Sequence, residues 1–369
     1  MDSVSQGLSF NRSKRRGRST VSAVGIGALC LSLAALSTIS STASGLAASR
    51  APLAAASSNK KLTSIVVQLA LVPPKMVFLG FYAAQDKGFY ARNGLSVKLV
   101  AESTGVQAVR GMVSGHGFFS AGGTDGLATA AAAGAKFKGI WNYASDDLSI
   151  IASKDVATLK DLAGKTIGIT DKVGPAYTLP VLALNSVGLP ASASKYAILG
   201  GRPALVSALA SGQIQAAAFH VDDGLTVVKK DPSVHVLAAM SKLVPKWWYG
   251  TVLVDDTYGK AHPAVVKAFV TSLIEAQRWM LANRSATIAL GIKYTGFDPD
   301  VVAKSYDILK ANHNWIIDKA GMNPTNVNYT LGFFRSSGVI PKSSKISYAS
   351  IIDTSYLDAV MKKLGPGKY

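Results

Sequence analysis

The sequence predicts an α/β protein built from two similar lobes with a cleft between them. The main observation is a repeated pattern: a Gly-Leu turn, a short apolar run, a helical stretch ending at Ser-Gly, and a second apolar run. It occupies residues 94–121 and returns over residues 188–219. A repeated strand–helix–strand unit indicates two lobes of similar build. Ligands of open α/β sheets bind at the carboxyl ends of strands, so we expect the binding site there.

The first lobe is expected to start with a strand at residues 62–71, where the residues alternate in polarity and are often β-branched. Pro73-Pro74 stops it, and residues 76–90 predict one helix that Gly88 closes. Asn93-Gly94 then turns the chain into the next strand. The remaining predictions are strands at 97–100, 118–121 and 136–143 and helices at 103–113 and 122–133.

A new alternation of strands and helices starts after residues 145–153, which we expect to cross into the second lobe. The predicted strands there are 166–170, 196–199, 216–219 and 234–239, and the predicted helices are 158–164, 176–187, 203–210 and 222–229. A strand at 249–254 should return the chain to lobe one. Five helices should then cover that lobe, at 263–282, 286–294, 299–312, 326–336 and 355–364. The predicted domains are therefore a signal segment at 1–50, lobe one at 61–150, lobe two at 151–250, and the return with C-terminal helices at 251–369.

The first 50 residues have the pattern of a signal peptide. A basic stretch at residues 12–18 precedes an apolar run at 21–36, and small residues at 43–56 offer several cleavage sites. We therefore expect export to the periplasm or cell envelope, by the Sec route or, given the twin arginines, the Tat route. An uncleaved anchor and a lipid attached to Cys30, the single cysteine, are the alternatives. Removal of this segment would leave a mature chain without a thiol.

Composition narrows the function classes. With 49% hydrophobic residues in 369, the chain can form two real cores and is not of the disordered class. Residues 1–50 contribute +5 of the formal net charge of +18, so the remainder is still basic. Its lysines are scattered singly, without a basic helix face interleaved with aromatics, so we expect no nucleic-acid partner. The charge suits contact with an anionic envelope and a bias toward anionic ligands, and we expect a monomer.

Four motifs occur in the order and spacing of one family. They are residues 80–100 (GFYAAQDKGFYARNGLSVKLV), 126–138 (GLATAAAAGAKFK), 161–168 (DLAGKTIG) and 208–217 (ALASGQIQAA). The set resembles the solute-binding proteins of ABC importers in the nitrate, sulfonate and taurine group, also called the NMT1/THI5-like group. The resemblance covers about residues 62–290. It implies a type II periplasmic-binding-protein fold, with two α/β lobes joined by two crossing strands and closing on ligand as a hinge.

Two loops of lobe one are candidate ligand contacts. Ser103 and Thr104 begin a helix directly after a strand, so their hydroxyls and free backbone N–H groups would suit an anionic group. Gly123, Thr124 and Asp125 repeat that arrangement in the next loop, where glycine lets a ligand approach the backbone. An ordinary helix cap and a tight turn are the alternatives.

In lobe two, similar proteins place a Gly-Ser or Gly-Thr pair for an anionic group where this chain has Gly174 to Tyr177. The hydroxyl is missing here, which disfavours a simple oxyanion and leaves Tyr177 as an aromatic contact. Arg202, at a predicted helix start, could clamp a carboxylate, or it could simply be solvated. His220 is also a candidate, because the loop after the second copy of the repeat is acidic and carries this imidazole.

Aromatic residues supply further candidates. Trp247, Trp248 and Tyr249 precede the returning strand, and adjacent strand residues point to opposite faces. At least one of them should therefore reach the cleft and could stack on a planar ligand, with hinge packing as the alternative. Phe81 and Tyr82 could line the same space or belong to the core.

These observations favour binding over catalysis. The five histidines lack metal-ligand spacing, and no Ser-His-Asp order, phosphate loop or paired acids stand out, so we expect neither a metal nor a cofactor. The expected function is extracytoplasmic capture of a small organic anion or an aromatic or heterocyclic solute, of the sulfonate, nitrate, carboxylate or thiamine-precursor class, and its delivery to an ABC permease. The alternative is an enzyme on the same fold, such as a THI5-like pyrimidine-precursor synthase, although that type carries a cysteine cluster. A sensor domain would need a transmembrane or DNA-binding segment.

Overall fold

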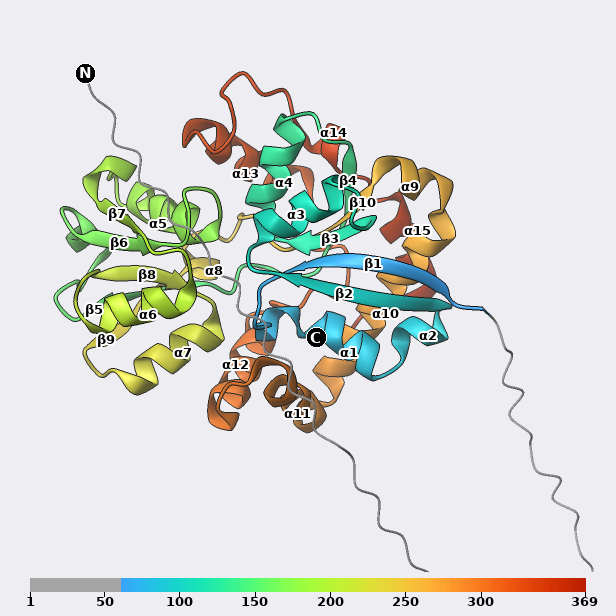
Figure 1. Cartoon of the computed structure of the whole chain (residues 1–369), viewed down its shortest axis with the longest axis horizontal. Coiled ribbons are helices and arrows are strands. Elements are labelled where there is room, and N and C mark those ends of the chain that lie inside the picture. Colours follow the sequence, from blue (N-terminus) through green and yellow to red (C-terminus); the bar gives the residue numbers. More distant parts are fainter. Residues whose placement is uncertain (1–60) are drawn as a thin grey trace, which may run out of the picture. The chain divides into compact units, whose positions relative to one another are not determined.

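A computed structural model of the chain describes residues 61–369. The predictions on the signal segment, its export route and Cys30 lie outside the described residues. The described chain forms two five-stranded sheets, with strand orders β2-β1-β3-β10-β4 and β7-β6-β8-β5-β9 (Figure 1). We call the first sheet with its helices lobe one and the second lobe two.

The sheet of lobe one contains β1 (Thr63–Ala70), β2 (Leu95–Glu102), β3 (Phe119–Gly122), β4 (Phe137–Asn142) and β10 (Thr251–Asp255). Strand β1 pairs in parallel with β2 and β3, whereas β10 runs antiparallel between β3 and β4. The chain thus enters this sheet a second time, more than 100 residues after β4.

The sheet of lobe two contains β5 (Ser149–Ser153), β6 (Thr166–Ile169), β7 (Lys195–Ile198), β8 (Ala216–Phe219) and β9 (Val234–Ala239). Strand β6 pairs in parallel with β7 and β8, and β5 runs antiparallel between β8 and β9. Both sheets therefore follow one plan. The repeated sequence pattern corresponds to β2–α3–β3 in lobe one and β7–α6–β8 in lobe two, as predicted.

The helices connect the strands and extend the C-terminal third. Their bounds are η1 Met76–Phe78, α1 Leu79–Asp86, α2 Phe89–Arg92, α3 Gly105–Val113, α4 Thr124–Ala132, η2 Leu159–Leu162, α5 Pro175–Ser186, η3 Ala191–Ala193, α6 Arg202–Ala210, α7 Val221–Lys230, α8 Met240–Leu243, α9 Asp256–Ala261, α10 Pro263–Ala282, α11 Arg284–Thr295, α12 Pro299–Ala311, α13 Pro324–Ser336, α14 Tyr348–Ile351 and α15 Ser355–Leu364. Within residues 61–369, no helix combines the length and apolarity needed to cross a membrane.

The prediction of one helix over residues 76–90 is wrong. The segment consists of η1, α1 and α2, and Gly88 lies between the last two with a φ of 72°. This left-handed conformation suits glycine and interrupts the helix, but the chain resumes helical geometry at Phe89. Gly88 therefore separates two short helices here, and the helical segment continues beyond it.

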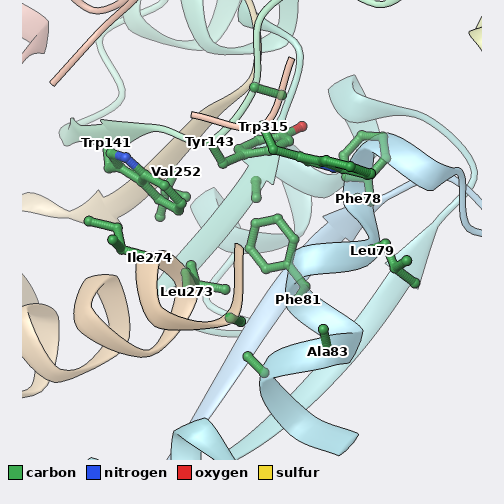
Figure 2. Close-up of a cluster of buried hydrophobic side chains, with 14 of the residues drawn as sticks. Phe78, Leu79, Phe81, Ala83, Trp141, Tyr143, Val252, Leu273, Ile274 and Trp315 are labelled. Atoms are coloured by element: carbon green, nitrogen blue, oxygen red, sulfur yellow. The ribbon is translucent and has the colours of Figure 1, made fainter. Parts of the chain in front are cut away.

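The core of lobe one holds α1 and α10 against the sheet. Figure 2 shows Phe81 of α1 among the buried side chains of this cluster, which include Leu273 of α10 and Trp141 of β4. The ring of Tyr143 lies 5.2 Å from that of Phe81 and 5.5 Å from that of Phe78. Tyr143 directly follows β4, so this packing fixes the point at which the chain leaves lobe one.

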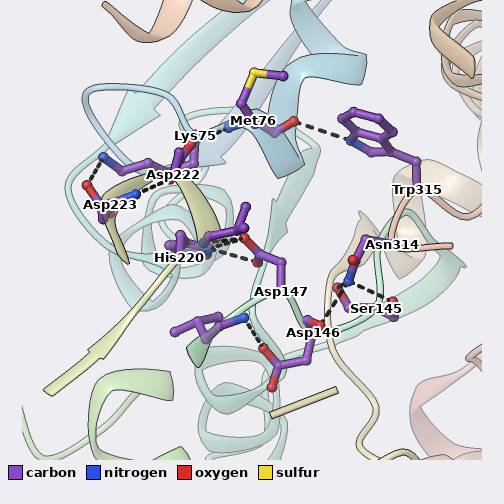
Figure 3. A network of polar contacts seen from close by, with 12 residues as sticks. Lys75, Met76, Ser145, Asp146, Asp147, His220, Asp222, Asp223, Asn314 and Trp315 are labelled. Atoms are coloured by element: carbon purple, nitrogen blue, oxygen red, sulfur yellow. Dashed lines mark hydrogen bonds and ion pairs between the residues drawn. The ribbon is translucent and has the colours of Figure 1, made fainter. Parts of the chain in front are cut away.

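Two segments, residues 143–148 and 244–250, connect the lobes. They meet where the Tyr143 N–H donates to the Gly250 carbonyl, at 2.9 Å. Asn314 braces the first segment, because its Nδ2 donates to the Asp146 carbonyl at 2.9 Å and its carbonyl accepts from the Ser145 N–H at 3.0 Å. These bonds, drawn in part in Figure 3, place the connection against the loop after α12.

Gly250→Ala is expected to destabilise the protein by about 1–3 kcal/mol, because overpacking a filled site has that cost. A Cβ at Gly250 would lie 2.7 Å from Cζ of Tyr143, whose ring is fully buried and cannot move aside. Urea unfolding of the two proteins measures the loss. Gly332→Ala is the matched control, since that exposed helical glycine has no atom within 4 Å of an added Cβ and should gain about 0.5–1 kcal/mol. Equal stability of Gly250→Ala and wild type would contradict the close contact.

Candidate functional site

A cavity of about 540 Å³ lies between the lobes, and we call it the interlobe cavity. Its walls are the loops that follow the parallel strands of both sheets. Lobe one contributes residues 70–73, 103–106, 123 and 125–126, and lobe two contributes 170–171, 173–176, 200–203 and parts of 220–230. The loop at residues 295–297 adds Phe297. The cavity therefore occupies the strand ends where a ligand is expected in an open α/β fold.

Eight of the fourteen predicted site residues line the interlobe cavity: Ser103, Thr104, Gly123, Asp125, Gly174, Arg202, His220 and Tyr249. The six others, Phe81, Tyr82, Thr124, Tyr177, Trp247 and Trp248, are outside its lining. Sequence reasoning did not single out several further lining residues, among them Lys75, Asp171 and Phe297, and it noted Asp223 only as part of the acidic loop that holds His220. Asp171 follows a predicted strand directly, a signal that could have found it.

The aromatic residues outside the lining have packing partners. The Tyr82 ring lies 4.9 Å from that of Tyr294, and the Tyr177 ring 5.0 Å from that of Tyr196. Phe81 belongs to the core described above. Phe81 is buried, whereas Tyr82 and Tyr177 remain partly exposed beside their aromatic partners.

The tryptophans before β10 pack against the C-terminal helices. The Trp247 ring lies 5.3 Å from that of Phe334 in α13. The backbone N–H of Trp248 donates to Oγ1 of Thr330, also in α13, at 2.9 Å. The Trp248 carbonyl accepts a bond of 2.9 Å from Oγ1 of Thr124, the other predicted residue outside the lining. The connection between the lobes is thus tied to α13 and to the start of α4.

An ion pair network crosses from one lobe to the other. Lys75, which follows β1, places its Nζ 2.8 Å from Oδ1 of Asp223 in α7, and Arg202 Nη1 lies 3.1 Å from Oδ2 of the same carboxylate. Burial opposes ionisation of Asp223, but the positive charges of Arg202 and Lys75 outweigh it and hold its pKa below the usual value. Arg202, predicted as a clamp for a ligand carboxylate, thus already holds a carboxylate of its own lobe.

The residues that begin α7 bind lobe one and the connecting segment (Figure 3). The Met76 N–H donates to Asp222 Oδ2 at 2.8 Å, and His220 Nδ1 lies 2.8 Å from Oδ1 of Asp147 in the segment 143–148. Burial, and then the negative charge of Asp223, raise the pKa of Asp222 to about 6. The Val221 N–H donates to Asp147 Oδ2 at 3.3 Å, so all of the first four residues after β8 are joined to parts of the chain that precede lobe two.

Asp125 is the most buried carboxylate of the lining, with 1% of the residue exposed. Its Oδ1 accepts a bond of 2.7 Å from Thr178 Oγ1 in α5 of lobe two. Burial is the main cause that raises its pKa to about 6, and the negative charge of Asp171 adds to it. Asp171 is half-buried and accepts a 2.7 Å bond from the Val173 N–H, and burial raises its pKa as well.

The interlobe cavity is mostly apolar between these polar groups. Its lining includes Val106 of lobe one, Val206 and Val227 of lobe two, and the rings of Phe78 and Phe297. Such a surface suits a small organic molecule with an apolar or aromatic body held by a few polar contacts. Among the described residues, no group of three or more His, Cys, Asp or Glu is placed to hold a metal ion.

Comparisons with known proteins place the fold. A family model described as NMT1/THI5 like matches residues 75–286. YtlA of Bacillus subtilis (strain 168), classed only provisionally as a binding protein, is 24% identical over 303 residues, which cover 75% of this chain and 89% of YtlA.

Solved structures agree in fold at low identity. The periplasmic aliphatic sulphonate binding protein SsuA from Escherichia coli has a TM-score of 0.68 and 18% identity, covering 79% of this chain and 92% of SsuA. The periplasmic nitrate-binding protein NrtA from Synechocystis PCC 6803 has a TM-score of 0.68 and 12% identity, covering 83% of this chain and 90% of NrtA. The desulfurization enzyme DSZB has a TM-score of 0.58 and 12% identity, covering 82% of this chain and 99% of DSZB. These matches confirm the predicted periplasmic-binding-protein fold, which binding proteins share with an enzyme.

Proposed function

The chain belongs to the NMT1/THI5-like family, and from this membership we propose that it is the solute-binding component of an ABC importer. It captures a small organic solute outside the cytoplasmic membrane and delivers it to the transmembrane subunits of a permease. The observation that carries this proposal is the interlobe cavity of about 540 Å³, lined by strand-end loops of both lobes. That volume falls in the range of about 300–1,000 Å³ typical of small-molecule sites.

Ligand contacts come, in this proposal, from the eight predicted residues that line the interlobe cavity, together with Lys75, Asp171, Asp223 and Phe297. The names of SsuA and NrtA indicate sulfonates and nitrate as the first solutes to test, and the apolar walls favour aromatic and heterocyclic compounds as well. Export to the periplasm or cell envelope and a monomeric state belong to the same proposal.

A binding role is favoured over the enzyme alternative because the relative in sequence and the two transport-related structures are named as binding proteins. Lys75 and Arg202, two cationic side chains of the lining, are engaged with Asp223 in a network that joins the lobes. That arrangement fits closure around a bound solute.

The first test is native mass spectrometry of freshly purified protein, followed by thermal unfolding with sulfonates, nitrate, aromatic carboxylates and pyrimidines. We expect a small molecule bound one to one, and a melting temperature that rises with its concentration. At a concentration of 100 times Kd, the free energy of unfolding should increase by about 2.7 kcal/mol. Consumption of the solute would favour the enzyme. Absence of both a co-purified molecule and any stabilisation would contradict the proposed function.

Matched variants localise the site. Val206→Trp places a large side chain on a residue of the cavity lining, so it should abolish solute-dependent stabilisation. Val113→Trp adds the same side chain at a valine that is 51% exposed and outside the lining, and it should bind as wild type does. Loss of binding in both variants, or in neither, would place the solute elsewhere.

A further inference from the structure

Two aspartates occupy equivalent positions in the lobes. Asp125 is the second residue of α4, which follows β3, and Asp222 is the second residue of α7, which follows β8. Strands β3 and β8 hold the same place in the two sheet orders. Both carboxylates are buried, with 1% and 0% of the residue exposed.

The two carboxylates differ in their partners. Both oxygens of Asp222 accept backbone N–H bonds of 2.8 Å, Oδ1 from Asp223 and Oδ2 from Met76 of the opposite lobe. Oδ1 of Asp125 accepts from Thr178 of the opposite lobe, but its Oδ2 has no hydrogen-bond partner among residues 61–369. A buried acceptor without a donor costs about 1–3 kcal/mol, and more when it is charged.

The cationic groups of the lining do not compensate Asp125. Lys75 and Arg202 both bind Asp223, and Lys230 lies on an exposed turn at the far end of α7. The charge that acts on the pKa of Asp125 is instead that of another carboxylate, Asp171 of lobe two, which raises it. Within the described residues, neither Asp125 nor Asp171 makes a salt bridge. The positive charge of Arg110 offsets part of the effect of burial on the pKa of Asp171, whereas no cation acts on Asp125 in this way among the described residues.

Asp125 Oδ2 lies close to the point where the two lobes meet. A Cβ at Gly123 would lie 3.7 Å from this oxygen and 3.3 Å from Cγ of Pro175. Because Gly123 has no side chain, the two lobes can approach closely at this point, and Oδ2 is buried in this arrangement. A group entering as the lobes separate could reach the oxygen there.

We propose that the solute of the interlobe cavity carries a cationic or N–H-rich nitrogen group, such as an ammonium, an amidine or an amino-heterocycle, which donates to Oδ2 of Asp125. Asp171 supplies a second negative charge from the opposite lobe. The nitrogen takes the role that the Met76 N–H has for Asp222. This inference rests on the proposed function and replaces the anionic bias deduced from net charge.

The test uses compound pairs that differ in one nitrogen group: taurine and isethionate, benzamidine and benzamide, 4-aminopyrimidine and 4-methylpyrimidine. Calorimetry should show that wild-type protein binds the nitrogen-bearing member of at least one pair about tenfold or more tightly than its partner, the effect of one hydrogen bond to a charged group. Asp125→Asn should abolish that preference. Without solute, it should melt at or above the wild-type temperature, because the variant removes a buried charge without a cation.

Asp155→Asn is the control, since that carboxylate is exposed, belongs to lobe two and pairs with Lys165 outside the cavity. It should keep the wild-type preference. Equal binding within every pair that binds, or a preference that survives in Asp125→Asn, would overturn the inference and leave the proposed function standing. If no pair binds, the co-purified molecule decides: one without a donor nitrogen overturns the inference. If no pair binds and no molecule co-purifies, the proposed function is contradicted, and this inference with it.

Discussion

Asp223→Ala is expected to cost about 3–5 kcal/mol of folding stability, the usual loss when one partner of a buried ion pair is removed. Lys75 and Arg202 would lose their shared carboxylate, and the Lys75 side chain, only 4% exposed, would remain buried with its charge. Urea unfolding at pH 7 measures the loss. The pKa of Asp223 is held below its usual value, so its contribution is present above the unfolded pKa of about 3.9 and disappears as the pH falls through the lower folded value. The difference between variant and wild type should therefore shrink in acid.

Asp307→Ala provides the comparison for that experiment. Its ion pair with Arg284 is half-exposed, with side-chain exposures of 55% and 50%, and such pairs contribute no more than about 1 kcal/mol. If the two variants lost the same stability, the network between the lobes would be no stronger than an ordinary surface pair.

Trp248→Ala should also cost about 3–5 kcal/mol, because it empties the space of a fully buried indole. Trp248→Phe should cost much less, since Trp248 Nε1 has no hydrogen-bond partner within residues 61–369. Chemical unfolding orders the three proteins. Trp248 lies outside the cavity lining, so the folded Trp248→Phe protein should bind solute with wild-type affinity.

Trp279→Ala is the matched control, because that indole is only half-buried and lies under the Lys87 ammonium, 5.2 Å from its ring centroid. Its loss should be clearly smaller. A solute affinity that drops in Trp248→Phe while stability is retained would instead support the sequence-based prediction that this tryptophan stacks on the ligand.

Much of the fold could be predicted from local signals. The glycines that end α3 and α6 and the apolar runs around them predict both copies of the repeat, and hence equivalent units in the two sheets. Local signals also place Ser103, Gly123 and Arg202 at strand ends, and these residues do line the interlobe cavity. They failed at Gly88, where a glycine interrupts a helical segment without ending it.

Partners distant in sequence could not be predicted in this way. Lys75 and Asp223 are 148 residues apart, so nothing near Arg202 indicates that its carboxylate is shared with lobe one. At least one of Trp247, Trp248 and Tyr249 was expected at the cleft because adjacent strand residues diverge, and Tyr249 lines the interlobe cavity. Which of the three does so depends on α13, some 80 residues later, because Trp247 and Trp248 pack on it. Whether a side chain in the segment between the lobes is buried or lines the cavity depends on which distant element packs against it.

The common strand order of the two sheets has a consequence for the ligand contacts. Each lobe presents three loops to the interlobe cavity at equivalent strand ends. The two halves can therefore carry different loop residues on one strand order, although loop residues such as Asp223 also hold the lobes together. Residues 123–125 and 220–222 hold equivalent places at the starts of α4 and α7 but differ in side chains, so a substitution in one set would alter the ligand contacts of one lobe only.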